Sequence, residues 1–202
     1  MSVEAKARLR LKSSLNALVP TSATLNIIDL MLYAGLRRAE VASLTTGNFK
    51  QDGGRWWIVL QGKGNKTRRL KVSDTLYKSI TAWVEYLNGQ DNGITLNLEI
   101  DDLPIFYNLN KGGNLTGNLL NSNVIAYIVS EYAAAAGLAP DHGENQLSPH
   151  DLRRSCARNA FDNGASLLKV QRMLGHADPK TTALYIGSDE NDDDTAVDYV
   201  RY

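Results

Sequence analysis

Hydrophobic residues recur every three or four positions in several separate stretches of the chain, which is the spacing that lines one face of a helix. The clearest stretch follows Ser73 and consists of Leu76, Ile80, Trp83, Val84 and Leu87. Comparable stretches begin near residues 21, 121, 148, 166 and 178 at a Ser, Thr, Asn or Asp, whose side-chain oxygen can cap a first helical turn. We predict a helix in each stretch, and a shorter helix around Val41 and Leu44.

The predicted helices have recognisable ends. Gly35, Gly137 and Gly175 each follow a hydrophobic stretch, and glycine is common just beyond a helix because it readily adopts the left-handed backbone. Pro149 stands at a first helical position, where its missing N–H costs no hydrogen bond. The best-bounded helix is therefore expected over residues 121–136.

Two shorter segments have the pattern of paired strands. Residues 55–60 (RWWIVL) and 67–72 (TRRLKV) flank the glycine-containing stretch 62–66 (GKGNK), which suits a tight hairpin. Residues 88–117 are rich in Asn, Gly and Asp, so we expect a loop there. The fold class predicted is α+β: mainly α-helical, with a small antiparallel sheet that carries Lys63 in its hairpin.

The length and composition predict one main domain. The chain has 202 residues, of which 43% are hydrophobic, enough to bury a sizeable core. We place this domain at residues 21–187. Residues 1–20 would be an N-terminal extension or the remnant of a linker, and residues 188–202 an acidic C-terminal tail.

The charges are segregated although they cancel, with 22 Lys and Arg against 22 Asp and Glu. Residues 35–71 hold nine basic and two acidic residues, and residues 148–182 hold six basic and three acidic ones. Acidic residues predominate over 74–146 and from Ser188 onward. A basic face beside acidic segments is typical of a DNA-binding surface on a neutral protein. Ordinary solvated charge is the alternative.

Two further features bear on the class of protein. No hydrophobic run approaches the roughly 18 residues of a membrane span, and none follows Met1 as in a signal peptide. The single cysteine, Cys156, excludes an internal disulfide and suits a reducing cytosol. We therefore expect a cytoplasmic protein that does not engage a membrane.

Six side chains scattered along the chain have the chemistry of phosphoryl transfer. They are Arg37, Lys63, His150, Arg153, His176 and Tyr185. Arginine forks bind pairs of phosphate oxygens, and histidine donors share the negative charge that develops there. A tyrosine supplies a nucleophilic oxygen and a lysine supplies a proton. His150 and Arg153 lie three positions apart, so they share one helix face.

Each of these residues has an ordinary structural interpretation when it is taken alone. Arg37 could pair with Glu40 at a helix end, Lys63 could be a simple turn residue, and Tyr185 could be a core aromatic. These interpretations leave the order and spacing of the six residues unexplained. Only to Glu40 do we assign such a role, that of orienting Arg37.

Five of the segments together resemble the tyrosine recombinase (phage integrase) family, in that family's order. They are residues 34–40 (AGLRRAE), 62–68 (GKGNKTR), 148–154 (SPHDLRR), 174–176 (LGH) and Tyr185, nine positions after His176. The stretch 104–106 followed by 111–113 also looks like the family's loop before its next helix. The resemblance covers roughly residues 20–187. One such motif is common by chance, whereas five in order are specific.

The resemblance implies a site-specific DNA recombinase whose catalytic domain is residues 21–187. It would cut and rejoin strands by transesterification through a 3′-phosphotyrosyl intermediate, without metal or ATP. Arg37, Arg153 and His176 would hold the non-bridging oxygens of the scissile phosphate, and Tyr185 would attack it.

The same resemblance assigns the proton transfers and the DNA contacts. Lys63 would protonate the leaving 5′-oxygen, and His150 would assist proton transfer at the tyrosine. Four further residues are expected to contact DNA: Lys66, Arg68, Arg69 and Arg154.

No cofactor and no metal ion are expected. The histidines are His142, His150 and His176, and no Cys-x-x-Cys or His-Glu-x-x-His pattern is present. Residues 189–194 are acidic but lack the glycine and alternation of a calcium loop. Residues 62–64 lack the spacing of a nucleotide-binding loop.

The expected partner is double-stranded DNA, bound by a tetramer of the chain on two DNA sites, with a monomeric free form. Family members usually carry an N-terminal DNA-binding domain that closes a clamp on DNA, so such a domain or an accessory protein is expected to complete the clamp. The tail is where the family often docks a segment on a neighbouring subunit; Val197, Tyr199 and Val200 are its apolar candidates. The place of action would be the nucleoid of a prokaryotic or phage-infected host, on a mobile element.

Three alternatives stay open at this point. Within the same chemistry, the chain could be a resolvase, an invertase or a type IB topoisomerase-like enzyme. It could be a DNA-binding regulator without catalysis, although all six residues are intact. It could also be a helical interaction module, for which a basic hairpin has no purpose.

Overall fold

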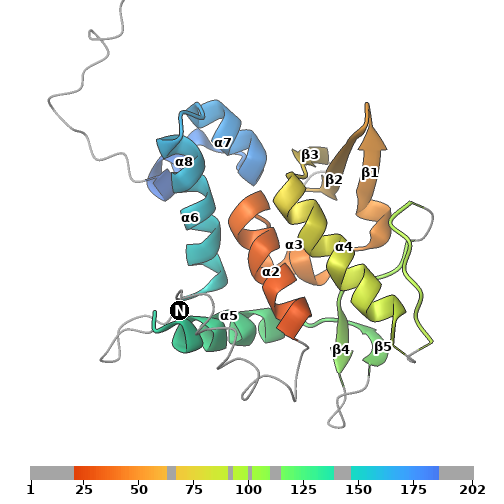
Figure 1. Cartoon of the computed structure of the whole chain (residues 1–202). Helices are drawn as coiled ribbons and strands as arrows, with labels where there is room; N and C mark the ends of the chain where they lie inside the picture. Colours follow the sequence, from red (N-terminus) through yellow and green to blue (C-terminus); the bar gives the residue numbers. More distant parts are fainter. Residues whose placement is uncertain are drawn as a thin grey trace, which may run out of the picture.

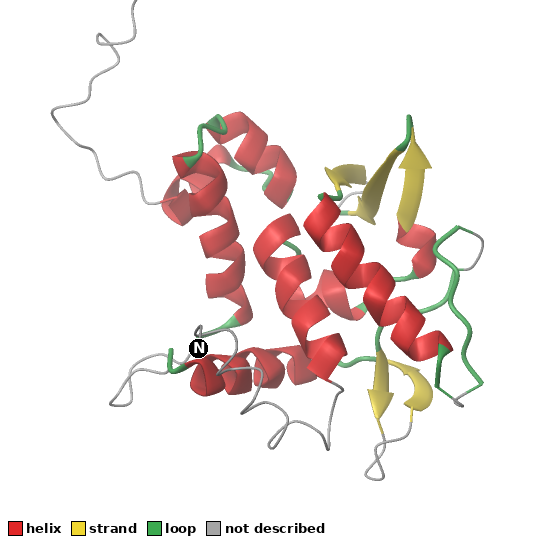
Figure 2. Ribbon diagram, in the orientation of Figure 1, coloured by secondary structure: helices red, strands yellow, loops and turns green. Residues whose placement is uncertain are grey.

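The computed structural model describes residues 21–62, 67–90, 93–99, 102–109, 115–138 and 147–186. Most of its elements are helices, and the strands lie to one side of them (Figures 1 and 2). The elements are α2 (Thr21–Ala34), α3 (Arg38–Ala42), a 3-10 turn η1 (Thr46–Asn48), β1 (Phe49–Asp52), β2 (Arg55–Gln61), β3 (Thr67–Lys71), α4 (Asp74–Asn88), β4 (Tyr107–Leu109), β5 (Leu115–Leu119), α5 (Ser122–Ala136), α6 (Pro149–Asp162), α7 (Leu167–Leu174) and α8 (Pro179–Ile186). The predicted α+β class, mainly helical with a small antiparallel sheet, is confirmed.

The helices begin and end at the residues whose chemistry predicts it. The Ser73 hydroxyl accepts a hydrogen bond from the first turn of α4, and the Asn121 side chain does the same for α5. Gly137 closes α5 with a left-handed φ of +74°. Gly175 closes α7 in the same way, with φ +65°, and this places His176 directly beyond the helix.

The predicted hairpin is present as part of a three-stranded antiparallel sheet with the order β1-β2-β3. Gln61 pairs with Thr67 at the end of the hairpin where the two strands are connected, and Ile58 pairs with both Leu70 and Phe49. Strand β1 was not predicted. Residues 63–66, which include the predicted site residues Lys63 and Lys66, lie outside the described residues, as do the predicted extension 1–20 and the tail 188–202.

The loop predicted for residues 88–117 is wrong in part, because it contains the antiparallel strands β4 and β5. The polar composition of this segment gives no sign that Ile105 and Phe106, just before β4, lie in the core. The Trp83 indole N–H donates to the Ile105 carbonyl at 2.9 Å. Tyr107 then pairs with Leu119.

Two hydrophobic clusters position the site. Helix α2 crosses the centre of the molecule and packs against α4 and α6, with fully buried side chains such as Leu30 and Met31. A smaller cluster joins α6, α7 and α8 through Ala157, Val170, Leu174 and Ile186. None of the helices in the described part of the chain is long and apolar enough to cross a membrane.

Candidate active site

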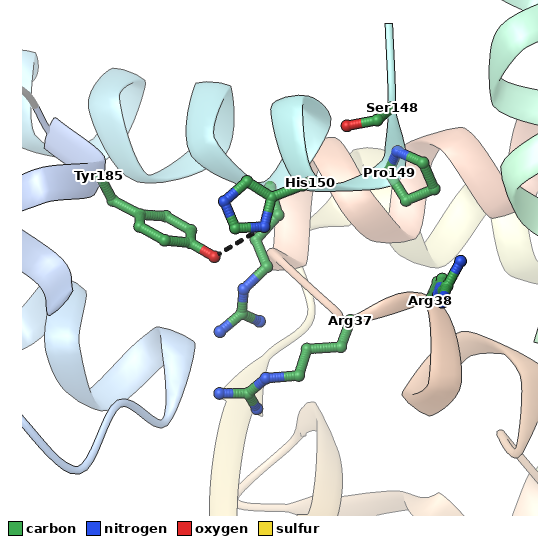
Figure 3. A pocket seen from close by; sticks show the side chains of 7 residues that line it. Arg37, Arg38, Ser148, Pro149, His150 and Tyr185 are labelled. Carbon is green, nitrogen blue, oxygen red and sulfur yellow. Dashed lines mark hydrogen bonds between the residues drawn. The ribbon is translucent and has the colours of Figure 1, made fainter.

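Five of the six predicted catalytic side chains come together where α3, α6, α8 and the turn after α7 meet. A cavity of about 360 Å³ lies among them; its lining residues are Arg37, Arg38, Ser148, Pro149, His150, Arg153 and Tyr185. Figure 3 shows Arg37 extending toward the Tyr185 side of this cavity, whereas Arg38 lies on the opposite side and extends away from Tyr185. The sixth predicted residue, Lys63, is outside the described residues.

Arg37 is held at the N-terminus of α3 by Glu40. Its backbone N–H donates to one Glu40 carboxylate oxygen at 2.7 Å, and its Nη1 donates to the other at 2.8 Å. Nη2 donates to the Gly175 carbonyl at 3.1 Å. This geometry shows the contact between Glu40 and Arg37 on which the predicted orienting role depends.

The Glu40 carboxylate also accepts hydrogen bonds from both terminal nitrogens of Arg68, at 2.8 Å and 2.7 Å. Burial alone would raise the pKa of Glu40, but the hydrogen bonds from Arg68 and Arg37 outweigh it and lower the pKa to about 2. Arg68 was predicted to contact DNA. Its side chain is turned inward, where it is only 11% exposed, and its expected contact with DNA stays a prediction.

Arg153 is almost fully buried on α6. Its Nη1 donates to the Gly35 carbonyl and its Nη2 donates to the Leu174 carbonyl at 2.5 Å. These carbonyls lie at or just beyond the C-terminal ends of α2 and α7, where the partial negative charge of a helix favours a cation. Burial and the neighbouring Arg37 lower the pKa of Arg153 to about 10, so it is charged at neutral pH.

His176 lies between Arg153 and a threonine. Its Nε2 is 3.2 Å from Arg153 Nη2 and its Nδ1 is 3.0 Å from the hydroxyl of Thr182. Because arginine only donates, this arrangement assigns the imidazole proton to Nδ1. Burial, together with the charges of Arg153 and Arg37, lowers the pKa of His176 to about 4. The ring is therefore neutral at neutral pH.

Thr182 was missed by the sequence analysis. It is completely buried, and its hydroxyl is the Nδ1 partner just described. One signal was available: Thr182 precedes Tyr185 by three positions, so both face the same side of α8.

Tyr185 projects from α8 toward His150 on α6 (Figure 3). Its hydroxyl oxygen is 3.0 Å from His150 Nδ1. The ring meets the rings of His150 and His176 edge-on, with centroids 4.7 Å and 4.8 Å away. Arg154 Nε donates to the Tyr185 carbonyl at 3.3 Å and helps to fix the backbone of α8.

The remaining expected DNA contact among the described residues, Arg69, lies on the surface of the sheet. Its guanidinium stacks over the Trp57 ring at 4.6 Å and pairs with Asp52 at 2.7 Å. Both Arg69 and Arg154 are exposed, so their expected contact with DNA stays a prediction. No cluster of three or more His, Cys, Asp or Glu residues suited to a metal ion occurs among the described residues.

Residues 11–192 match the model of the phage integrase family. The chain belongs to this family. Among curated proteins, it is similar to the tyrosine recombinase XerD of Staphylococcus epidermidis, with 30% identity over 79% of this chain and 48% of that protein. It is also similar to XerD of Rickettsia bellii, with 33% identity over 82% of this chain and 52% of that protein. The chain thus spans about half the length of the curated relatives it matches.

Two solved structures share the fold. XerA recombinase aligns over 99% of this chain and 64% of its own, with a TM-score of 0.67 and 19% identity. A lambda integrase dimer bound to a COC′ core site aligns over 96% of this chain and 61% of its own, with a TM-score of 0.63 and 15% identity. At these identities the likeness establishes the fold alone.

Proposed function

We propose that residues 21–187 are the catalytic domain of a site-specific tyrosine recombinase, which cuts and rejoins DNA strands through a 3′-phosphotyrosyl link. The observation that carries this proposal is the contact between the Tyr185 hydroxyl and His150, made within one chain beside Arg37 and Arg153. A nucleophile, a base and two phosphate-binding forks around one cavity are the parts that such a reaction requires.

Arg37, Arg153 and His176 bind the non-bridging oxygens of the scissile phosphate. The Nε of Arg153 is buried and has no hydrogen-bond partner among the described residues, so it is a donor available for a ligand. A bound phosphate would offset the arginine charges that lower the pKa of His176. Protonation at Nε2 would then let His176 donate to the pentacoordinate phosphorane, where negative charge develops.

Tyr185 attacks phosphorus while its proton passes to His150. One bond forms between the tyrosine oxygen and phosphorus, the bond from phosphorus to the 5′-oxygen breaks, and Lys63 supplies the proton to that leaving oxygen. The phosphodiester energy stays in the covalent link, so rejoining by a 5′-hydroxyl needs neither ATP nor metal. The hydroxyl of a second DNA completes recombination, as at the integration of a mobile element.

Double-stranded DNA is therefore the proposed partner. Lys66, Arg69 and Arg154 supply contacts to its backbone, and a tetramer of the chain on two DNA sites is the working assembly. An N-terminal DNA-binding domain or an accessory protein closes the clamp, and the reaction takes place in the cytoplasm, at the nucleoid.

The test is to trap the intermediate without knowing the target site. The chain is incubated, in buffer with EDTA, with a pool of nicked duplexes of randomised sequence, in which the short cleaved strand diffuses away and prevents rejoining. A protein–DNA adduct that survives denaturation, enriched for one sequence on repeated selection, supports a site-specific recombinase. DNA binding without any adduct would favour a regulator instead, and adduct formation that requires magnesium would contradict the metal-free chemistry.

A further inference from the structure

Arg68 makes three hydrogen bonds that join the sheet to two other parts of the molecule. Both of its terminal nitrogens bind the carboxylate of Glu40, at 2.8 Å and 2.7 Å. Its Nε donates to the carbonyl of Met173, near the C-terminal end of α7, at 3.1 Å. One side chain of β3 thereby connects α3, which Arg37 directly precedes, with α7, which ends two residues before His176.

The alternation of side chains along β3 explains why Arg68 faces the interior and Arg69 does not. Side chains alternate along a strand, and the buried Leu70 lies two positions after Arg68. Arg68 therefore faces the interior with Leu70. Arg69 faces the other way and is 47% exposed.

Arg68 also lies directly against Gly175. A Cβ on Gly175 would come within 2.9 Å of Arg68 Cδ and 3.2 Å of its Nη1, so this close approach requires glycine. The Gly175 carbonyl is a partner of Arg37, and the next residue is His176. Arg68 thus contacts the backbone that precedes His176 and, through Glu40, the guanidinium of Arg37.

We propose that Arg68 is a positioning residue for the reaction proposed above: it holds Arg37 through Glu40 and His176 through Gly175, and it does not contact DNA. A guanidinium paired fork to fork with a carboxylate has one geometry, which a lysine ammonium cannot reproduce. Displacement of a catalytic group by about 1 Å can slow a reaction by about 100-fold. The expected effect on the reaction rate rests on the proposed function. The contacts that position Arg37 and His176 do not, because they are present in the protein without DNA.

The experiment compares Arg68→Lys and Arg68→Met with Arg55→Lys and Arg55→Met in the full chain. Arg55 is an exposed arginine of β2 in the same sheet, so it controls for loss of charge and of a long side chain. We measure the rate of adduct formation at saturating duplex, the affinity for that duplex, and the thermal unfolding midpoint. Arg68→Lys is expected to slow adduct formation by about 10–100-fold with an affinity within about threefold of the unchanged chain, while both Arg55 variants keep the rate.

A coupling measurement separates positioning from a general loss of stability. If Arg68 acts on Arg37 through Glu40, then Glu40→Gln and Arg68→Met remove part of the same support, and the rate loss of the double variant is smaller than the product of the two single losses. A rate loss in the double variant equal to the product of the two single losses would overturn the proposal. So would an Arg68→Lys variant that keeps its full rate, or one whose loss lies in DNA affinity alone.

A measurement without DNA keeps this inference distinguishable from the proposed function. The side-chain nitrogen resonances of Arg37 and His176 are recorded in the free chain and in the Arg68→Lys and Arg55→Lys variants, all at a temperature where each is folded. If the resonances of Arg37 and His176 change in Arg68→Lys but not in Arg55→Lys, the positioning role is supported. This holds even if the unchanged chain forms no adduct on any duplex. Unchanged resonances would overturn it.

Discussion

The hydroxyl oxygen of Tyr185 lies 3.0 Å from Nδ1 of His150, although the two residues are 35 positions apart in the chain. The contact joins α8 to the first turn of α6, and Arg154 fixes α8 from the same helix through the Tyr185 carbonyl. The nucleophile and its base are therefore assembled in one chain before DNA binds.

His150 is expected to govern the reaction rate and not the affinity for DNA. His150→Ala removes the group that takes the proton of Tyr185, and general bases typically contribute a factor of about 10²–10⁴. Adduct formation at saturating duplex should fall by that order while the dissociation constant stays within a few-fold. A rate that is unchanged in His150→Ala would show that the contact is structural.

Thr182 is expected to set the orientation of the His176 ring. Thr182→Val keeps the shape of the side chain but leaves Nδ1 of His176 without its partner, so adduct formation should fall by about tenfold or more. Thr182→Ser keeps the hydroxyl and should retain most of the rate. The control is Thr181→Val, because Thr181 is exposed on the same helix; equal losses in Thr181→Val and Thr182→Val would rule out the orienting role.

Two helix-ending glycines provide a matched test of the packing around Arg68. Gly137 and Gly175 both have a left-handed φ, but a Cβ on Gly137 would meet no atom within 4 Å, whereas one on Gly175 meets Arg68. Gly137→Ala should lower the free energy of unfolding by about 1–2 kcal/mol from backbone strain alone. Gly175→Ala should lower it further and should also slow adduct formation. Equal destabilisation by the two substitutions, measured by denaturant unfolding, would contradict the close packing.

His176 should make the folded chain less stable in mild acid. Its pKa is about 4 in the folded chain and about 6.5 for a free histidine, so between these pH values the unfolded chain binds more protons. The stability that depends on a neutral His176 is complete above pH 6.5 and is lost as the pH falls toward 4. The pKa of Glu40 is about 2 instead of 4.5, so the stability that its ionised carboxylate contributes is lost only as the pH falls below 4.5.

The measurement is the thermal unfolding midpoint at pH 7 and pH 5. The decrease should be larger for the unchanged chain than for His176→Gln, in which this group cannot titrate. A decrease of the same size in both proteins would mean that other groups cause the acid sensitivity.

The elements that could be predicted are those whose signals are local. The boundaries of α5 follow from Asn121 and Gly137, which satisfy the helix ends with neighbouring atoms. Strands β4 and β5 could not be predicted in the same way, because their stability comes from pairing with each other and from the anchoring of Ile105 and Phe106 in the core. Tertiary packing there overrides an Asn- and Gly-rich composition.

The residues of the candidate site also differ in whether a local sequence signal identifies them. The order and spacing of the motifs identify Arg37, His150, Arg153, His176 and Tyr185 as a group, and the structure brings these five together. The role of Arg68 depends on Glu40, 28 positions earlier, and on Met173, 105 positions later. No sequence pattern gives those contacts; only the alternation of Arg68 with the apolar Leu70 could have indicated that Arg68 faces inward.

In the proposed reaction, Tyr185 itself becomes covalently joined to DNA. The direct measurement is to digest the trapped adduct with protease and nuclease and to identify the modified residue by mass spectrometry, with Tyr185→Phe treated in parallel. We expect a nucleotide on the peptide that contains Tyr185, and a Tyr185→Phe chain that binds the duplex as tightly but forms no adduct. An adduct on another residue, such as Tyr199 or Tyr202, or one that persists in Tyr185→Phe, would contradict the proposed reaction.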